Sequence, residues 1–332
     1  MQTERHTSDQ VADLGALSDL CTPWCVHVVA TLRIADHIAA GMSKVEDLAA
    51  ATGCDCHVLH CVLGHLVSKG VFEEPDSGRF ALNEAARGLL EPGMLIGLDL
   101  NDLGGRLAHP WGTLLEYVRT GKPAYHEVFG RTFWEDLDEH PKIAASFDAI
   151  IGPMGHGTPN ADFEITGGWD AVRRVVDVGG GTGAMLAEVV RAHPQIKGTL
   201  VDLPRTVARS EELFRAAGVA ERATAVGQSF FDPLPPGADL YLLRGILNDW
   251  PDQATVEILT RCAEAARPNG RVVVLKSVGR DDAPKRLMIE MVLCGGKHRT
   301  VAEFRELARE SGLQVVAAGQ QASYFVVECR PA

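Results

Sequence analysis

The chain has 332 residues, of which 46% are hydrophobic and 23% charged, and this composition is typical of a globular protein with about two domains of roughly 100–200 residues each. The formal net charge of −12 argues against a nucleic-acid partner, because neutralising phosphates requires clustered lysine and arginine. Residues 1–10 lack the layout of a secretion signal, and no apolar run reaches the roughly 18 residues of a membrane span. The sequence therefore predicts a soluble cytoplasmic protein without a membrane partner.

The eight cysteines are expected to be reduced thiols, since nothing in the sequence indicates secretion. Two groups combine cysteine with histidine; they comprise Cys54, Cys56, His57, His60 and Cys61, and Cys21, Cys25 and His27. Neither group has the paired Cys-x2-Cys elements of structural zinc sites. Residues 58–66 also have the spacing of an amphipathic helix, on which cysteine is a small hydrophobic residue. We expect no metal ion.

The first 90 residues have mostly helical spacing of apolar positions. Helices are predicted over 11–20, 25–40 and 56–68, and short strands over 71–74 and 79–82 on either side of a tight turn. Ser43, with Glu46 three positions later, predicts a capping box at the start of another helix. Three helices followed by a hairpin are typical of a winged-helix domain.

Residues 83–166 read as helices broken by glycine and proline, and short β-branched runs then alternate with helical stretches. Strands are predicted over 175–178, 199–203, 223–226, 238–243, 271–275, 313–316 and 324–328, with a helix over 253–266. This alternation predicts an α/β domain whose parallel sheet is covered on both faces. We expect a winged-helix-like domain over 1–100, a helical linker over 101–166, and a Rossmann-like domain over 167–332.

A glycine-rich turn, Gly179–Gly183, follows the strand over 175–178. Glycines let the backbone approach a ligand closely, and the turn brings the amides of a helix N-terminus beside it. Asp202, at the end of the next strand, is suited to accept hydrogen bonds from ribose hydroxyls. The turn fits S-adenosylmethionine (SAM) and also a nicotinamide dinucleotide, because a G-x-G-x-x-G/A pattern that ends at Ala184 is an allowed variant.

Three further features favour SAM. Asp177 lies in the strand before the glycines, residues 227–235 are polar and then aromatic, which suits an adenine, and the fourth strand ends in Leu243–Trp250. On these residues the chain, from about 167 to 330, resembles the class I SAM-dependent methyltransferases. More narrowly, it resembles the plant caffeate-type O-methyltransferases and their actinobacterial relatives that tailor natural products, and looks closest to the anthracycline 4-O-methyltransferases and their 10-hydroxylase relatives.

The resemblance extends to the N-terminal part through 22–24 and 30–38, and to Arg299, Thr300 and Phe304. It implies that 1–100 is a dimerisation domain that forms a homodimer and that the linker over 101–166 contributes to the substrate pocket. It also implies SAM as cofactor, S-adenosyl-L-homocysteine as product, and a small aromatic substrate from natural-product or antibiotic biosynthesis. The predicted cofactor-binding residues are Asp177, Gly179, Gly181, Gly183, Asp202, Leu203, Gln228, Ser229, Phe230 and Arg244. Family members often have Asp where this chain has Gln228, whose oxygen can still accept a hydrogen bond.

The sequence departs from the family at its acid–base positions. Asn248 stands where many members have the His that deprotonates the substrate, and Lys276 and His298 stand where glutamates are usual. Asparagine takes up no proton in the neutral range. One interpretation is transfer by proximity and orientation, and another makes His298 a relocated general base. A third is that a SAM-binding chain performs C-methylation, decarboxylation, hydroxylation or a pericyclic reaction.

Large apolar and polar residues are candidates for the substrate pocket, because such pockets are mostly apolar with a few polar groups. They are Trp24, Trp111, Phe147, Met154, His156, Asn248 and Met291. A metabolite-sensing winged-helix regulator is the rival outside enzymes. Its recognition helix, 56–68, has no basic stripe, and Glu73, Glu74 and Asp76 follow at the wing, which argues against DNA binding. We therefore expect a SAM-dependent O-methyltransferase.

Overall fold

The computed structural model describes residues 12–150 and 158–332. It divides into two compact units, Met1–Ala108 and His109–Ala332, which are taken in turn. The separation of a linker and substrate-pocket region over 101–166 stays a prediction. Among the described residues, no helix combines the length and apolarity needed to cross a bilayer.

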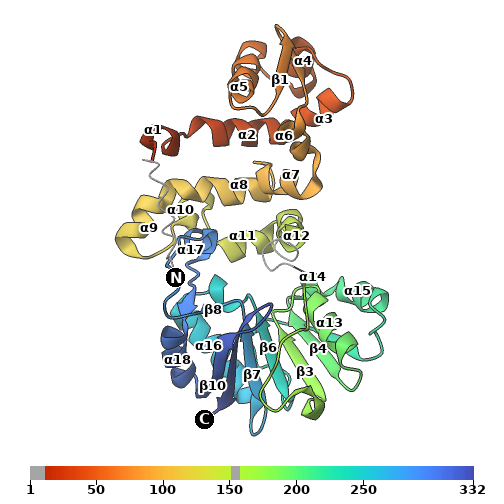
Figure 1. Cartoon of the computed structure of the whole chain (residues 1–332), viewed down its shortest axis with the longest axis vertical. Coiled ribbons are helices and arrows are strands. Elements are labelled where there is room, and N and C mark those ends of the chain that lie inside the picture. The colour runs from red at the N-terminus through yellow and green to blue at the C-terminus, as the bar shows by residue number, and fades with distance from the viewer. Residues whose placement is uncertain (1–11, 151–157) are drawn as a thin grey trace, which may run out of the picture. The chain divides into compact units, whose positions relative to one another are not determined.

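The N-terminal unit is helical apart from one hairpin (Figure 1). Its elements are α1 (Leu14–Leu17), α2 (Cys21–Thr31), α3 (Ile34–Ala39), α4 (Val45–Thr52), α5 (Cys56–Ser68), β1 (Glu73–Asp76), β2 (Arg79–Ala81), α6 (Glu84–Arg87), η1 (Gly88–Leu90), α7 (Pro92–Leu98) and α8 (Leu103–Ala108). The core includes Val29, Ile34 and Leu63, none of which is accessible to solvent. The helix predicted over 56–68 and the hairpin after it are confirmed, and with them the winged-helix pattern.

The capping box expected at Ser43 is wrong. Helix α4 begins at Val45 after Lys44, and no side chain caps it. The Ser43 hydroxyl instead accepts a hydrogen bond from Arg79 Nη1 at 3.1 Å. The capping box does not form because the helix N-cap is Lys44, one residue later than expected. At this position the backbone of Lys44 pairs with that of Arg79 in the β1–β2 hairpin.

The C-terminal unit opens with short helical elements and continues into an α/β domain. The first are η2 (His109–Thr113), α9 (Leu114–Thr120), α10 (Tyr125–Phe129), α11 (Phe133–Glu139), α12 (Pro141–Ile150) and η4 (Trp169–Ala171). The strands of the large sheet are β3 (Arg174–Val178), β4 (Lys197–Asp202), β5 (Ala223–Gly227), β6 (Leu240–Arg244), β7 (Arg271–Leu275), β10 (Leu313–Gln320) and β11 (Phe325–Pro331). Their order is β10-β11-β7-β6-β3-β4-β5. β11 runs antiparallel to both neighbours, and the pairs from β7 to β5 are parallel.

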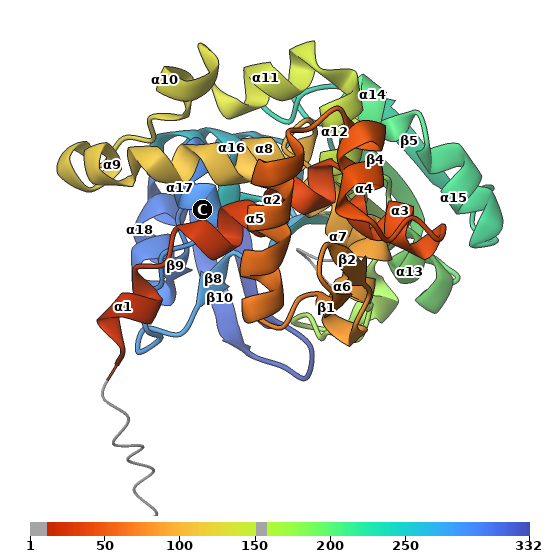
Figure 2. The ribbon, with the colours of Figure 1, turned by 90° about the horizontal axis from the view of Figure 1, so that it is seen from above.

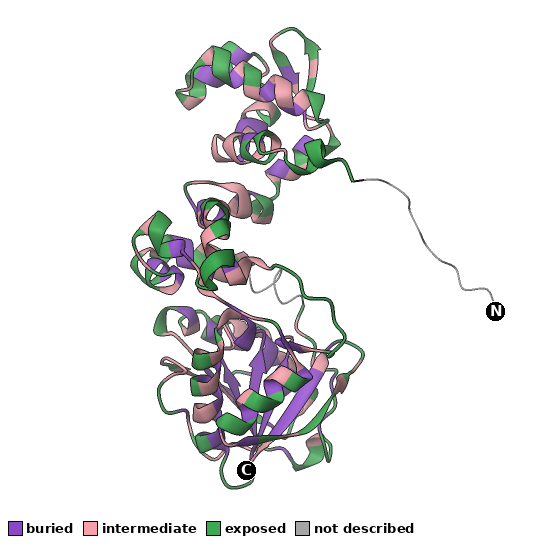
Figure 3. Ribbon diagram, turned by 90° about the vertical axis from the view of Figure 1, so that its left-hand side faces the viewer, coloured by how far each residue is buried: buried purple, intermediate pink, exposed green. Residues whose placement is uncertain are grey.

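Helices cover both faces of this sheet, as the strand–helix alternation predicted. The remaining elements are α13 (Ala184–Ala192), α14 (Pro204–Val207), α15 (Ser210–Ala216), η5 (Leu247–Asp249), α16 (Asp252–Ala266), β8 (Val278–Gly279), α17 (Ile289–Cys294), β9 (Arg299–Thr300) and α18 (Val301–Glu310). Figures 1 and 2 show α16 and α18 on one side of the sheet and α13 and α15 on the other. Each side forms its own hydrophobic core, and the central strands between them are buried (Figure 3). The carboxyl ends of β3, β4 and β6 are thereby held at one edge of the sheet.

A buried arginine fixes the segment after β6. The Arg299 side chain is inaccessible to solvent. It donates hydrogen bonds to the carbonyls of Leu247 at 2.7 Å and Trp250 at 2.8 Å, and to Asp252 Oδ1 at 2.9 Å. The guanidinium therefore clamps both ends of η5, because its planar fork can satisfy several acceptors at once.

Replacing Arg299 with lysine should destabilise the protein by roughly 3 kcal/mol, since an ammonium cannot reach all of these acceptors and leaves buried carbonyls unpaired. Urea unfolding followed by circular dichroism measures this change. Arg309→Lys is the matched control, because Arg309 is exposed on α18 and, among the described residues, pairs with Glu306 alone at 3.2 Å. Equal midpoints for the two variants would contradict the clamp.

Candidate functional site

The turn between β3 and α13 requires glycine for two separate reasons. Gly179, Gly181 and Gly183 have positive φ angles of 69°, 64° and 89°, which side-chain-bearing residues rarely adopt. A Cβ at Gly179 would also lie 2.8 Å from Ile246 Cδ1, and one at Gly183 only 2.6 Å from Phe214 Cε1. The turn thus brings bare backbone to the edge of the sheet.

Asp202 ties this turn to the next strand. Its Oδ2 accepts a hydrogen bond from the Gly181 amide at 2.8 Å, and its Oδ1 accepts one from the Leu203 amide at 2.7 Å. Burial raises the pKa of Asp202 to about 6, although both backbone bonds oppose the shift. Each carboxylate oxygen has two lone pairs, so the side chain retains acceptor capacity for two ligand hydroxyls.

Asp177 is a buried carboxylate aimed at the same turn. It is 1% exposed, and neither of its oxygens has a well-formed hydrogen bond to the described residues. Burial raises its pKa to about 7, while the nearby guanidinium of Arg244 opposes the shift. A buried acceptor in this state is suited to a cationic donor such as a ligand ammonium group.

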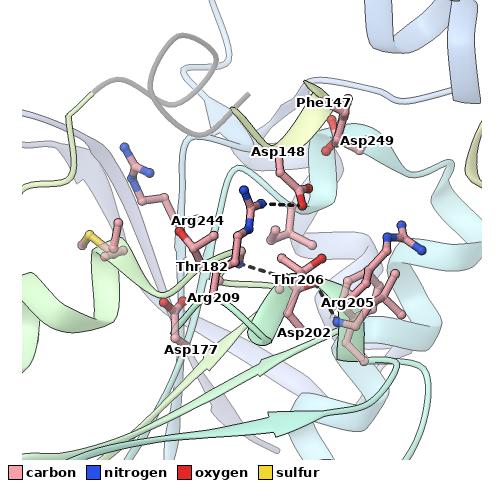
Figure 4. A pocket seen from close by; sticks show the side chains of 18 of the residues that line it. Phe147, Asp148, Asp177, Thr182, Asp202, Arg205, Thr206, Arg209, Arg244 and Asp249 are labelled. Carbon is pink, nitrogen blue, oxygen red and sulfur yellow. Dashed lines mark hydrogen bonds and ion pairs between the residues drawn. The ribbon is translucent and has the colours of Figure 1, made fainter. Parts of the chain in front are cut away.

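A cavity of about 750 Å³ opens above the turn, within the roughly 300–1,000 Å³ usual for small-molecule sites. Its lining includes Asp138, Asp148, Asp177, Gly179, Gly180, Gly181, Thr182, Asp202, Leu203, Arg205, Thr206, Arg209, Ser229, Phe230, Phe231, Arg244, Ile246 and Asp249. Figure 4 shows Arg209 reaching Asp148, 3.0 Å away, across this space. Glycine backbone, a ribose acceptor and an ammonium acceptor in one cavity fit SAM.

Aromatic rings make up another wall of the cavity. Trp134 and Trp250 are stacked, with ring centroids 5.2 Å apart and planes 13° apart. Phe147 meets Trp134 edge-on at 5.9 Å, and Phe230 meets Trp250 edge-on at 5.8 Å. All four residues line the cavity. Such a wall favours a flat aromatic guest, because ring faces and edges attract one another.

Asn248 is buried and has both ends of its amide engaged. Its Oδ1 accepts a hydrogen bond from Ser277 at 3.0 Å, and its Nδ2 donates one to Asp249 Oδ1 at 2.8 Å. Asp249 itself lines the cavity. Burial, and then the charge of Glu290, raise the pKa of Asp249 well above its usual value. The titratable group here is therefore Asp249, the neighbour of the residue that the family resemblance singles out.

None of the three predicted acid–base candidates, Asn248, Lys276 and His298, lines the cavity. His298 is an exposed residue. Partial burial of its imidazole ring nevertheless lowers the pKa of His298, and the charge of Glu290 opposes this shift. Lys276 has a positive φ of 66°, and its ammonium lies 5.9 Å from the ring centroid of Tyr324. Burial, and then Arg244, lower the pKa of Lys276.

Most predicted cofactor residues line the cavity; they are Asp177, Gly179, Gly181, Asp202, Leu203, Ser229, Phe230 and Arg244. Two do not. Gly183 packs beneath the turn against Phe214, and the Gln228 amide donates to the carbonyl of Pro233 at 3.0 Å.

Of the substrate candidates, Phe147 lines the cavity, whereas Trp111 and Met291 do not. Trp24 belongs to the N-terminal unit and is 40% exposed. Met154 and His156 lie outside the described residues.

Two segments contribute lining residues that no sequence pattern indicated. Asp138 and Asp148 come from α11 and α12, and Arg205, Thr206 and Arg209 follow Asp202. Asp249 was also missed, although it stands next to Asn248. The charged residues on these helices did not indicate a site, because charged residues on a solvent-exposed helix face have the same sequence pattern.

Comparisons with known proteins agree with this geometry. An O-methyltransferase domain matches residues 111–314, and an O-methyltransferase dimerisation domain matches residues 16–92. The 2,7-dihydroxy-5-methyl-1-naphthoate 7-O-methyltransferase of Streptomyces carzinostaticus is 40% identical over 95% of this chain and 96% of its own. The aclacinomycin 10-hydroxylase of Streptomyces purpurascens is 36% identical over 93% and 86%.

A solved structure is similar over nearly the whole chain. It is an O-methyltransferase from neocarzinostatin biosynthesis in complex with S-adenosyl-L-homocysteine and 1,4-dihydroxy-2-naphthoic acid, with a TM-score of 0.86 and 40% identity over 96% of this chain and 99% of that one. The cofactor of that protein matches the one for which the glycine turn, Asp177 and Asp202 are suited. This chain belongs to the O-methyltransferase family and is a SAM-dependent methyltransferase.

Proposed function

We propose that the chain methylates a hydroxyl group on a small, flat aromatic metabolite. The observation that carries this proposal is the continuity of one cavity from the glycine turn and Asp202 to the aromatic wall at Trp134 and Phe147. SAM, when bound, supplies an activated methyl group on a sulfonium. The protein has to hold an acceptor oxygen in line with that methyl and exclude water.

The cofactor half of the site divides its work among a few side chains. Asp202 is suited to the ribose hydroxyls and Asp177 to the ammonium group, while Ser229 and Phe230 are suited to the edge and face of the adenine. Arg244 lies close enough to lower the pKa of Asp177, so it helps to keep that carboxylate ionised. These assignments follow from hydrogen-bonding capacity and charge.

Orientation supplies the larger part of the rate in this proposal. A well-aligned bimolecular reaction gains roughly 7–11 kcal/mol at most from proximity, and an acidic phenol needs little help in losing its proton. We assign the proton of the hydroxyl to Asp249, a cavity carboxyl whose pKa burial and the charge of Glu290 raise well above its usual value. Asn248 is a positioning residue, because it holds Asp249 through one hydrogen bond and is itself held by Ser277.

The substrate class is supported by the relatives. Their names specify a naphthoate, a phenazine and 3-amino-4-hydroxybenzoate, all of them flat aromatic molecules. A cavity with a stacked tryptophan pair accommodates such molecules, and a dihydroxynaphthoic acid is the appropriate first probe.

Hydroxylation is a second candidate, because the relative at 36% identity is named a 10-hydroxylase. N-methylation has similar support from an 8-amino-8-demethylriboflavin N,N-dimethyltransferase at 32% identity. No observation favours decarboxylation, a pericyclic reaction, C-methylation or a nicotinamide cofactor. The expected cytoplasmic location and the lack of a nucleic-acid partner stay predictions.

We further propose a homodimer built on the N-terminal unit. The unit contains a matched dimerisation domain, and Leu14, Leu17 and Leu20 are 73–77% exposed. Exposed leucines at this density around α1 need a partner surface. Light scattering should give twice the chain mass, and a monomer at micromolar concentration would overturn the proposal.

Incubation with SAM and 1,4-dihydroxy-2-naphthoic acid should produce S-adenosyl-L-homocysteine together with a product heavier by one methylene group. Mass spectrometry measures both products. An aromatic molecule without a hydroxyl group is the control and should not be methylated. A product heavier by one oxygen would instead support the hydroxylase candidate. Absence of cofactor binding by calorimetry would remove both.

Asp202→Asn should weaken SAM binding about 10- to 100-fold, because an amide places a donor against the Gly181 or Leu203 amide and loses the charge. In the native protein, affinity should also fall as the pH drops through about 6, since the carboxylate becomes protonated. Calorimetry across pH 5–8 measures both effects. Asp282→Asn, an exposed change beside Arg280, should bind like the native protein.

Asp249→Asn should lower kcat by about a hundredfold or more and remove the acid limb of the pH–rate profile, since activity is lost as the base becomes protonated. Asn248→Ala removes a hydrogen bond that stabilises the ionised carboxylate, so it should move that limb to higher pH. His298→Ala should leave the limb in place. If His298→Ala removes it instead, the relocated histidine is the base.

A further inference from the structure

Two helices of the N-terminal unit bring two thiols and an imidazole together. Cys21 and Cys25 lie one turn apart on α2, with their sulfur atoms 3.7 Å apart. His65 comes from α5, and one ring nitrogen and the two sulfurs all lie within 4.8 Å of one another. The sequence paired these cysteines with His27 instead, but His27 Nδ1 is hydrogen-bonded to the carbonyl of Leu98 at 2.8 Å.

A chain of hydrogen bonds determines which nitrogen of His65 is available. Thr22 Oγ1 lies 2.5 Å from Asp19 Oδ2 and 2.8 Å from His65 Nε2. A carboxylate only accepts hydrogen bonds, so the Thr22 hydroxyl donates its single proton to Asp19 and accepts from Nε2–H. Neutral His65 therefore has its proton on Nε2, which leaves Nδ1 as the ring nitrogen that can bind a metal ion. Metal-binding histidines are typically held by such a bond from the second nitrogen.

The sulfur separation matches that of a bound ion. Two thiolates bound about 2.3 Å from a tetrahedral zinc ion are roughly 3.8 Å apart, and the observed value is 3.7 Å. Soft sulfur and imidazole ligands of this kind select zinc and similar ions over magnesium or calcium. The Cys-x2-Cys spacing that this chain lacks is needed only where one short segment supplies the ligands, and here two helices supply them.

We propose that Cys21, Cys25 and His65 form a binding site for zinc or a similar divalent transition-metal ion. Binding releases one proton from each thiol to solvent and forms two metal–sulfur bonds and one metal–nitrogen bond. A water molecule completes the tetrahedron, because three ligands from the described part of the chain converge. The ion links α2 to α5 and so stabilises the fold of the N-terminal unit.

Cobalt(II) titration of the reduced full-length protein tests the site, because cobalt bound by thiolates absorbs in the near ultraviolet. We expect one cobalt per chain, displaced by zinc. Cys21→Ser should weaken binding at least about a hundredfold, since even the loss of a ligand's hydrogen-bond partner costs roughly 10–100-fold. His65→Ala should retain the thiolate band with weaker affinity. Thr22→Val, which removes only the orienting hydroxyl, should weaken binding by a smaller factor.

Cys61→Ser is the matched control. Cys61 lies on α5 with its sulfur 3.9 Å from His57 Nε2. This thiol–imidazole pair has no second thiol beside it in the described part of the chain. This variant should bind cobalt as the native protein does. Absence of a thiolate band in the native protein, or its loss in Cys61→Ser with retention in Cys21→Ser, would overturn the site. Thermal melts with and without zinc provide a second readout, with a rise expected only where Cys21, Cys25 and His65 are intact.

Discussion

The hydrogen bond from the Gly181 amide to Asp202 is the constraint on which the cofactor site depends. It joins the turn after β3 to the end of β4, two segments separated by a complete helix. The bond holds the glycine backbone open toward the cavity and orients the carboxylate toward ligand hydroxyls. The positive φ angles of the turn and the tight packing of Gly183 against Phe214 exclude other residues from the same path.

Arg299 fixes the segment Leu247–Trp250, just as Asp202 fixes the glycine turn. By holding the carbonyls of Leu247 and Trp250, it fixes the segment that carries Asn248 and Asp249. A single buried guanidinium thus sets both the position of the proposed base and the tryptophan that stacks on Trp134. The resemblance that marked Arg299 as a family residue acquires a physical reason here.

Asn248, in place of the usual histidine, cannot act as a general base, but it preserves the hydrogen bonds that hold this segment. The amide of Asn248 is fully engaged between Ser277 and Asp249, which suits support better than proton transfer. The neighbouring carboxyl is buried close to Glu290, and its pKa is raised as a result. The chain therefore lacks the usual histidine but keeps a titratable carboxyl, Asp249, beside that position. A well-oriented acidic phenol needs little help from a general base.

Periodicity and composition by themselves determined the α/β domain, the order of its strands along the chain, the winged-helix front and the glycine turn with Asp202, because each of these is encoded in a short segment. The family resemblance came from equally local motifs. Only the tertiary structure decided that Asp249 lines the cavity and His298 does not, that Arg205 and Asp148 belong to the site, and that Cys21 and Cys25 meet His65 rather than His27. These relations join residues far apart in the chain, and neither spacing nor propensity encodes which distant side chains share a cavity. The predicted N-cap at Ser43 was wrong for the same reason, since backbone pairing of Lys44 with Arg79 in the hairpin outweighed the capping preference of serine.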